Sequence, residues 1–454
     1  MMNTPDPCGP PDEVPEGAAV FPAIPEELGI HPLLLAVLHA IVFFDGSYLQ
    51  AASDIVHLNF HALGLRPPAY PLLLALCGLN TRVIWFAQSA LGITASWMIF
   101  DMALRRTGHG LFSLLVGLAC SLAPEVLFYE SSIMSEALTN FLLVTSIWLM
   151  SRRESNGKTT LWYRLVLGSI VAMAGLTRPL MICLAPVYFC FLVPLRAPAK
   201  ILQRALIKRM LAFAVPVAVL IFGWCGLVYS NTGLFSPTTA SGISMMNQVD
   251  PYVGLAPERY ALLRDAWLQS HWRMEKYPTR NAIPVFNGAV QMVEAQTGKS
   301  RIQVSREYQA LAVYLAIHHP LLYLRRAEQG WMQFWGEPTM DEVEWPQASA
   351  VTPSEFLMTL ASFLNREIDG AFVVLALLSL PCALVRPGTF TKLEYLIFAI
   401  ALWTSAFSAF MEFGENRRFC VPFYMLIVYT LLTRGWLWIT PSGSSESVIA
   451  AGSD

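Results

Sequence analysis

Charged side chains are scarce in this sequence. Asp, Glu, Lys and Arg make up 14% of its 454 residues, whereas about a quarter is typical of soluble domains. Hydrophobic residues make up 55%, and the mean hydropathy is +0.48. A soluble chain of this length would divide into domains with polar surfaces, and these few charges cannot cover them. The composition therefore predicts a polytopic membrane protein.

Three other signals are missing. The formal net charge of -2 provides no basic excess, so we expect no nucleic-acid partner. The eight cysteines lack the spacing of a metal site or a disulfide framework, and most lie within or beside apolar runs as small hydrophobic residues. The first thirty residues are acidic and rich in proline, without the basic segment of a secretory signal peptide.

Apolar runs that span or nearly span a bilayer core recur along the chain. They predict an all-α polytopic fold with about 10 transmembrane helices. The predicted spans are residues 31–44, 82–104, 111–128, 133–150, 161–176, 180–195, 210–229, 370–385, 393–413 and 420–438. The first run is short for a span. Residues 72–79 are too few to cross, so we expect a re-entrant or interfacial helix there.

Lysine and arginine gather in alternate loops, and such loops are usually cytoplasmic. This rule places the loop at 45–71, the long stretch at 230–366 and the segment before residue 420 on the outer side. The long stretch holds helix-like pieces such as 305–318, so we expect a folded subdomain rather than a linker. The predicted organisation is a cytoplasmic tail (1–30), an N-terminal transmembrane module (31–229) with a catalytic first outer loop (45–71), a periplasmic subdomain (230–366), C-terminal transmembrane helices (367–439) and a disordered cytoplasmic tail (440–454).

The first outer loop concentrates polar groups in an otherwise apolar region. It holds two acids and one base, Asp45, Asp54 and Arg66, together with Tyr48 and Tyr70. Ionisable residues at membrane depth are costly and often functional. The loop is therefore either a site of chemistry or a polar connection between two helices.

Other outer ionisable residues allow two interpretations each. Arg178 lies in a tight turn, where it either reaches lipid headgroups or binds a phosphate through its planar fork. Glu136 either caps a helix N-terminus or contacts substrate. Glu415, Arg417 and Arg418 precede the last span, and two arginines on this side oppose the usual charge bias, which favours a function. His57 and His61 are four residues apart without a third ligand nearby, so we expect no metal site.

These residues fall in a familiar order. The motifs are Asp45-Gly46-Ser47-Tyr48, Arg66-Pro67-Pro68-Ala69-Tyr70-Pro71, Ser135-Glu136, Leu176-Thr177-Arg178-Pro179, Asn231 to Phe235 with Ser236 to Thr239, and Glu415-Asn416-Arg417-Arg418-Phe419 through Pro422. The chain thus resembles the GT-C superfamily of membrane glycosyltransferases, near the branch of dolichyl-phosphate-mannose protein mannosyltransferases and aminoarabinose transferases. The resemblance covers most of residues 45–438.

The resemblance implies an inverting transfer from a polyprenyl-phosphate sugar to a lipid, glycan or protein acceptor, at the outer face of a bacterial inner membrane. In that mechanism a carboxylate takes the acceptor proton and cations neutralise the leaving phosphate. Asp45 is then the expected base, with Asp54 as its rival. The expected phosphate ligands are Arg66, Arg178, Arg417 and Arg418, and the expected substrate-orienting residues are Tyr48, Tyr70, Glu136 and Glu415. No cofactor is required, although the chemistry leaves room for a divalent cation.

Two alternatives belong to other classes. A transporter or flippase of lipid-linked sugars would show charges in mid-span or a broken-helix pair repeated in both halves, and the sequence shows no such repeat. An enzyme like an O-antigen ligase or polymerase would also carry a large outer loop and arginines, but it would not need the residues around Asp45.

Overall fold

The computed structural model of the chain describes residues 43–44, 46–59, 64, 66–156, 160–193, 204–274, 283–336, 353–386, 388–414 and 416–440. The regular secondary structure of these residues is helical apart from one parallel ladder of two residues in each strand, between β1 (Phe43–Phe44) and β2 (Ser132–Ile133). The helices up to the long outer stretch are α2 (Gly46–Val56), α3 (Ala69–Leu76), α4 (Thr81–Thr107), α5 (Gly110–Ser121), α6 (Pro124–Glu130), α7 (Glu136–Asn156), α8 (Leu161–Thr177), η3 (Pro179–Cys183), α9 (Leu184–Leu192) and α10 (Arg204–Thr232). Those that follow are α11 (Ser241–Val249), η5 (Asp250–Leu255), η6 (Glu258–Tyr260), α12 (Ala261–Met274), α13 (Ile283–Thr297), α14 (Arg301–His318), α15 (Pro320–Gly336), α16 (Pro353–Val385), α17 (Lys392–Met411), α18 (Asn416–Cys420), η8 (Val421–Phe423) and α19 (Tyr424–Ile439).

Long apolar helices identify an integral membrane protein. Five segments of the described chain are long and apolar enough to cross a bilayer: α4, Ile207–Thr232 of α10, Phe363–Val385 of α16, α17, and Asn416–Ile439 through α18 and α19. The pair α5 and α6, bent by 56°, makes a sixth if it forms one span.

The other predicted spans either correspond to helices that are shorter or more polar than a bilayer-crossing helix, or lie outside the described residues. α7, α8 and α9 occupy three predicted runs, but α7 carries more polar residues and the other two are shorter. Most of the run at 31–44 lies outside the described residues, so the expected total of about ten spans stays a prediction. Residues 72–79 contain most of α3, which has eight residues and is too short to cross.

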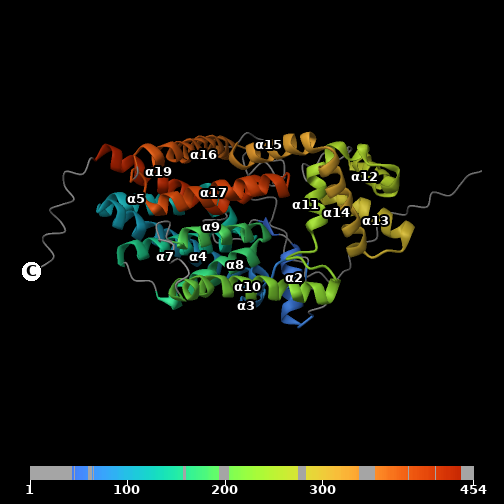
Figure 1. Cartoon of the computed structure of the whole chain (residues 1–454), viewed down its shortest axis with the longest axis horizontal. Coiled ribbons are helices and arrows are strands. Elements are labelled where there is room, and N and C mark those ends of the chain that lie inside the picture. Colours follow the sequence, from blue (N-terminus) through green and yellow to red (C-terminus); the bar gives the residue numbers. More distant parts are fainter. Residues whose placement is uncertain are drawn as a thin grey trace, which may run out of the picture.

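The long helices lie side by side along the long axis of the molecule, as Figure 1 shows. α8 and α10 approach one another especially closely at Gly168. A Cβ atom there would lie 2.3 Å from the Phe213 carbonyl oxygen, so only glycine fits this contact. Small residues allow such close backbone approach between membrane helices. The contact fixes α8, whose C-terminal end carries Arg178.

The predicted outer stretch forms a group of helices with its own core. α11, η5, α12, α13 and α14 bury a hydrophobic cluster around Trp267, Tyr308 and Leu311, and the predicted helical piece at 305–318 lies within α14. Figure 1 shows these helices at one end of the bundle. They contact α17 through Gln248, whose Nε2 donates to the Ala409 carbonyl oxygen at 2.7 Å.

At the same end of the bundle, several distant segments meet. The β1–β2 ladder pairs Phe44 with Ile133, which brings the chain entering α2 beside the start of α7. The Thr239 backbone N–H donates to the Gly64 carbonyl oxygen at 2.8 Å. Gly64 has φ of 136°, a conformation that favours glycine. Motifs on either side of α10 are thereby held together.

Candidate functional site

Three of the predicted site residues meet in a buried triad. Glu136 is the first residue of α7, Arg178 ends α8, and Arg418 lies in α18. Arg178 donates to Glu136 Oε1 at 3.0 Å, and Arg418 donates to the same oxygen. All three side chains are more than nine-tenths buried. Arg178 therefore has an acidic partner from a distant part of the chain, and its burial does not fit an arginine that reaches for headgroups.

A second buried ion cluster lies beside the first. Arg417 donates through one terminal nitrogen to both carboxylate oxygens of Glu125, at 3.0 and 3.1 Å. Its other terminal nitrogen donates to Asp369. Because Arg417 and Arg418 are consecutive in α18, the two clusters form one network. We call these six residues, Glu125, Glu136, Arg178, Asp369, Arg417 and Arg418, the outer-end network.

Burying so many ions is expensive. Such ions persist only where partners and hydrogen bonds compensate the loss of water. Within the described chain, three buried atoms of the outer-end network have no hydrogen-bond partner: Glu136 Oε2, Asp369 Oδ1 and Arg417 Nε. The network therefore retains hydrogen-bonding capacity that a substrate can use.

The first outer loop joins this network through Tyr48. The Tyr48 hydroxyl donates to Ser135 Oγ at 3.1 Å, one residue before Glu136. The Arg66 guanidinium carbon lies 4.5 Å from the centre of the Tyr48 ring, and Arg66 Nε donates to Ser47 Oγ at 2.7 Å. The structure thus brings two predicted residues of the loop next to the predicted triad.

Tyr70 has a different setting. Its side chain is fully buried, and its hydroxyl donates to Gln88 Oε1 at 2.6 Å. Gln88 Nε2 donates in turn to the carbonyl oxygens of Glu130 and Ser132, both at 2.8 Å. Tyr70 therefore supports the segment between α6 and α7 through Gln88, and this is how it contributes to the shape of the site.

Some predicted residues lie apart or outside the described chain. Asp54 is half-buried on α2, where Asn59 Nδ2 donates to it at 3.2 Å. Asp45, Glu415 and His61 lie outside the described residues. His57 is exposed and bonds the Ser53 carbonyl oxygen. Across the ranges that the structure describes, no group of three or more His, Cys, Asp and Glu side chains has the geometry to hold a metal ion.

The sequence prediction missed two acids of the outer-end network and one neighbouring acid. Glu125 and Asp369 pair with Arg417. Glu130 is buried against α4, where a Cβ atom on Gly92 would lie only 1.7 Å from its Oε1. All three lie at or near an end of an apolar run, and a count of ionisable residues at such ends would have found them.

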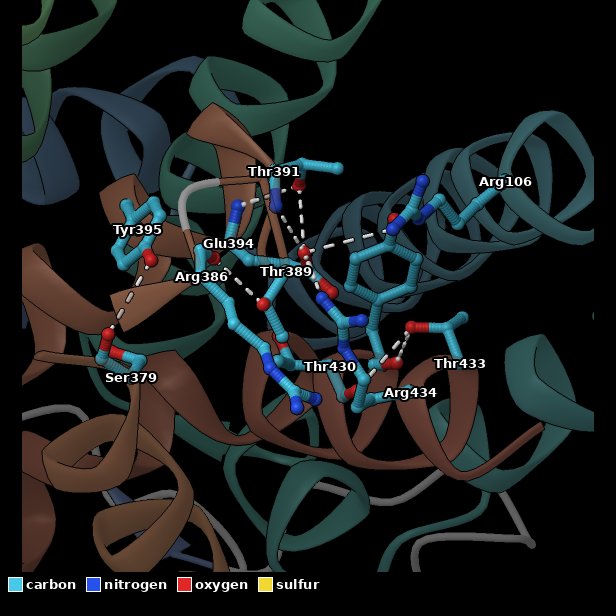
Figure 2. Close-up of polar contacts among 11 residues, drawn as sticks. Arg106, Ser379, Arg386, Thr389, Thr391, Glu394, Tyr395, Thr430, Thr433 and Arg434 are labelled. Carbon is cyan, nitrogen blue, oxygen red and sulfur yellow. Dashed lines mark hydrogen bonds and ion pairs between the residues drawn. The ribbon is translucent and has the colours of Figure 1, made fainter. Parts of the chain in front are cut away.

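A further ion cluster lies at the other end of α17 (Figure 2), with Glu394 and Arg434 buried and Arg106 half-buried. Glu394 Oε2 accepts from Arg434 NH2 at 2.6 Å, and Arg106 lies 3.7 Å from the same oxygen. Thr391 contributes its backbone N–H and its hydroxyl at 2.6 and 2.9 Å. We call Arg106, Thr391, Glu394 and Arg434 the Glu394 cluster.

The Glu394 carboxylate belongs to a capping box at the start of α17. In a capping box, side chains and backbone N–H groups at the helix start satisfy one another. The cluster therefore joins α17 to α4 and α19 and has the character of a structural clamp.

Comparison with known proteins gives no match: no family model, no curated protein and no solved structure matches this chain. The functional argument therefore depends on the geometry above and on the sequence motifs.

Proposed function

We propose that this protein is a membrane glycosyltransferase of GT-C type, which moves a sugar from a polyprenyl-phosphate donor to an acceptor at the outer-end network. One observation carries the proposal. Three residues from three separate motifs, Glu136, Arg178 and Arg418, are in direct contact. They come from positions up to 282 residues apart in the chain.

The triad has the chemistry that a phosphate leaving group requires. Two guanidinium groups converge on one carboxylate oxygen, which orients two planar cations at one place. Guanidinium groups match phosphate oxygens in a bidentate geometry and stabilise the charge that develops as the phosphate leaves. Because Arg178 and Arg418 meet at one oxygen of Glu136, we assign the phosphate to this pair, while Arg417 bridges Glu125 and Asp369. Arg66 is the third phosphate ligand, from the first loop.

In the proposed reaction the acceptor oxygen or nitrogen forms a bond to the anomeric carbon as the bond from that carbon to the phosphate oxygen breaks. The phosphate leaves with the electron pair and remains as polyprenyl phosphate. Asp45 takes the acceptor proton as general base. The residues on either side of Asp45 support this assignment, because Phe44 pairs with Ile133 and Tyr48 contacts Ser135, both just before Glu136.

The rest of the proposal follows from the sequence. We assign the site to the outer face of the membrane because lysine and arginine gather in the opposite set of loops, and to a bacterial inner membrane because of the GT-C resemblance. The helices α11 to α14 cover this end of the bundle (Figure 1), so we assign acceptor choice to them. The acceptor is a lipid, a glycan or a protein. The bundle has about ten spans in total.

The test is sugar transfer by purified protein in detergent, with a panel of polyprenyl-phosphate sugars as donors. Asp45→Asn keeps the shape of the side chain but removes the base, so the rate should fall about 10² to 10⁴-fold. Asp54→Asn is the matched control and should retain activity. Release of polyprenyl phosphate that survives in Asp45→Asn but is lost in Asp54→Asn would move the base to Asp54.

A transporter of lipid-linked sugars is the second candidate, because of one feature. α5 and α6 form a pair bent by 56°, with Glu125 and Glu130 in its second half. Broken helices with polar groups line the substrate sites of many transporters. Movement of a fluorescent lipid-linked sugar across proteoliposomes, without release of polyprenyl phosphate, would favour this function over transfer.

A further inference from the structure

One arginine outside the outer-end network lacks a carboxylate partner. Arg326 of α15 lies over Phe413, with its guanidinium carbon 3.0 Å from the ring centre, and it reaches Gln329 Oε1 at 3.4 Å. Its Nε is buried and has no hydrogen-bond partner within the described ranges. No carboxylate oxygen of the described residues forms an ion pair with it. A half-buried cation in this state is costly unless an anion joins it.

A tyrosine hydroxyl beside the start of α15 is also unused. The ring centre of Tyr252 lies 6.3 Å from that of His319, the residue before α15. Tyr252 of η5 is 8% exposed, and its hydroxyl has no hydrogen-bond partner in the part of the chain described here. Burial raises the pKa of Tyr252 to about 12, with the charges of Tyr323 and Arg326 as further influences. The hydroxyl therefore stays protonated at neutral pH and can donate a hydrogen bond.

The charge of Arg326 survives its burial. Burial lowers the pKa of Arg326 to about 10, against the opposing influence of Asp250 and Tyr252, so the guanidinium is charged at neutral pH. The neighbouring acid does not form a close pair with it. Asp250 Oδ1 accepts from Trp267 Nε1 at 2.6 Å and bonds His271 Nε2 at 2.7 Å.

We propose that Arg326 and Tyr252 form an anion site for a phosphate or carboxylate group on the acceptor. The guanidinium offers paired donors to such a group, and the tyrosine hydroxyl offers one more. The site lies between the α11–α14 helices and the bundle. Its Phe413 precedes Arg417 by four residues, so at most about 14 Å of chain separates it from the outer-end network. The assignment of this anion to the acceptor rests on the proposed function, whereas anion binding itself does not.

The experiment measures binding by the full-length protein in nonionic detergent, without turnover. The probes are dihexanoyl phosphatidic acid, dihexanoyl phosphatidylcholine, glucose 1-phosphate and inorganic phosphate, followed by calorimetry. We expect an anionic probe to bind, and Arg326→Gln to weaken that binding roughly tenfold or more, because a charge-assisted hydrogen bond is lost. Tyr252→Phe should weaken it severalfold. Arg325→Gln, which changes an exposed neighbour on the same helix, should leave it unchanged.

The probes separate the sources of the anion. Binding of phosphatidic acid alone identifies a lipid headgroup, and binding of glucose 1-phosphate or phosphate identifies a soluble group. The proposal is overturned if no anionic probe binds, or if folded Arg326→Gln and Tyr252→Phe bind every probe as the wild type does. If Arg326-dependent binding holds while no donor supports sugar transfer, the proposed function fails and the anion site stands. If a donor supports sugar transfer but no anionic probe binds through Arg326, the anion site fails and the proposed function stands.

Discussion

The two ends of α17 hold two groups of arginines around buried carboxylates, and the groups differ in how many of their buried atoms lack a hydrogen-bond partner. The Glu394 cluster lies at the first turn of α17, and the outer-end network follows its last turn, about 30 Å away for a 20-residue helix. In each, one carboxylate oxygen serves two arginines: Glu394 Oε2 for Arg106 and Arg434, and Glu136 Oε1 for Arg178 and Arg418.

The difference lies in where the hydrogen bonds come from. Glu394 is three residues from Thr391, and their mutual bonds close a capping box. Glu136 draws both of its arginines from distant helices, and its second oxygen has no partner in the described chain. Within the described chain, Arg434 Nε is the buried atom of the Glu394 cluster without a hydrogen-bond partner, against three such atoms in the outer-end network, and a partly satisfied buried network is costly. We infer that the Glu394 cluster stabilises the fold. The outer-end network loses stability through its unpartnered buried atoms, and we infer that these atoms serve a function.

The largest expected effect is on activity. Glu136→Gln removes the carboxylate that orients Arg178 and Arg418, so sugar transfer should fall by about 10² or more. Glu394→Gln is the matched variant, and each folded molecule should transfer sugar at close to the wild-type rate. Initial rates, normalised to the monodisperse fraction in size-exclusion chromatography, measure both. Equal losses of activity in the two variants would remove the distinction between the two ends.

The next effect is on stability. Arg417→Gln leaves Glu125 and Asp369 without their shared cation, so the free energy of unfolding should fall by about 3–5 kcal/mol. Arg434→Gln leaves Glu394 with Arg106 and the capping box, and should cost about 1.5–3 kcal/mol. Denaturant unfolding in detergent measures both. Arg105→Gln, at an exposed pair with Asp101, is the control and should stay close to the wild type. A larger cost for Arg434→Gln would contradict this ranking.

A smaller effect tests the local nature of the Glu394 cluster. Thr391→Ala removes the cap of α17 and should cost about 1 kcal/mol of unfolding free energy, while Thr391→Ser should restore most of it. Thr389→Ala changes an exposed hydroxyl that bonds only within its own turn and serves as control. If Thr391→Ala and Thr389→Ala melt alike, the capping box does not stabilise this end.

The smallest effect concerns the link between the first loop and the outer-end network. Tyr48→Phe removes the hydrogen bond to Ser135 but keeps the ring beneath Arg66, so it should cost about 1 kcal/mol and reduce transfer only severalfold. Tyr48→Leu also removes the ring and should reduce activity further. The difference between their rates measures the contact between Arg66 and the ring. Identical rates would show that Arg66 does not depend on it.

Local patterns in the sequence determined much of the fold. Apolar runs located the long helices, and a carboxylate after a small polar residue marked the start of α7 at Glu136. The Thr391-to-Glu394 spacing is likewise a local signature that the sequence displays. These features depend on contacts within a turn or a helix, so the order of residues specifies them.

Only the tertiary structure decided which charges meet. Nothing near Glu125 in the sequence points to Arg417, which lies 292 residues away, and Asp369 comes from a third helix. The partner of Arg178, and the lack of an ion pair between Arg326 and any carboxylate of the described chain, have the same origin. Apolar periodicity specifies that a helix forms, but side-chain packing between helices sets which ends come together. Ion pairs formed across helices follow from that packing, and a single sequence carries no local record of it.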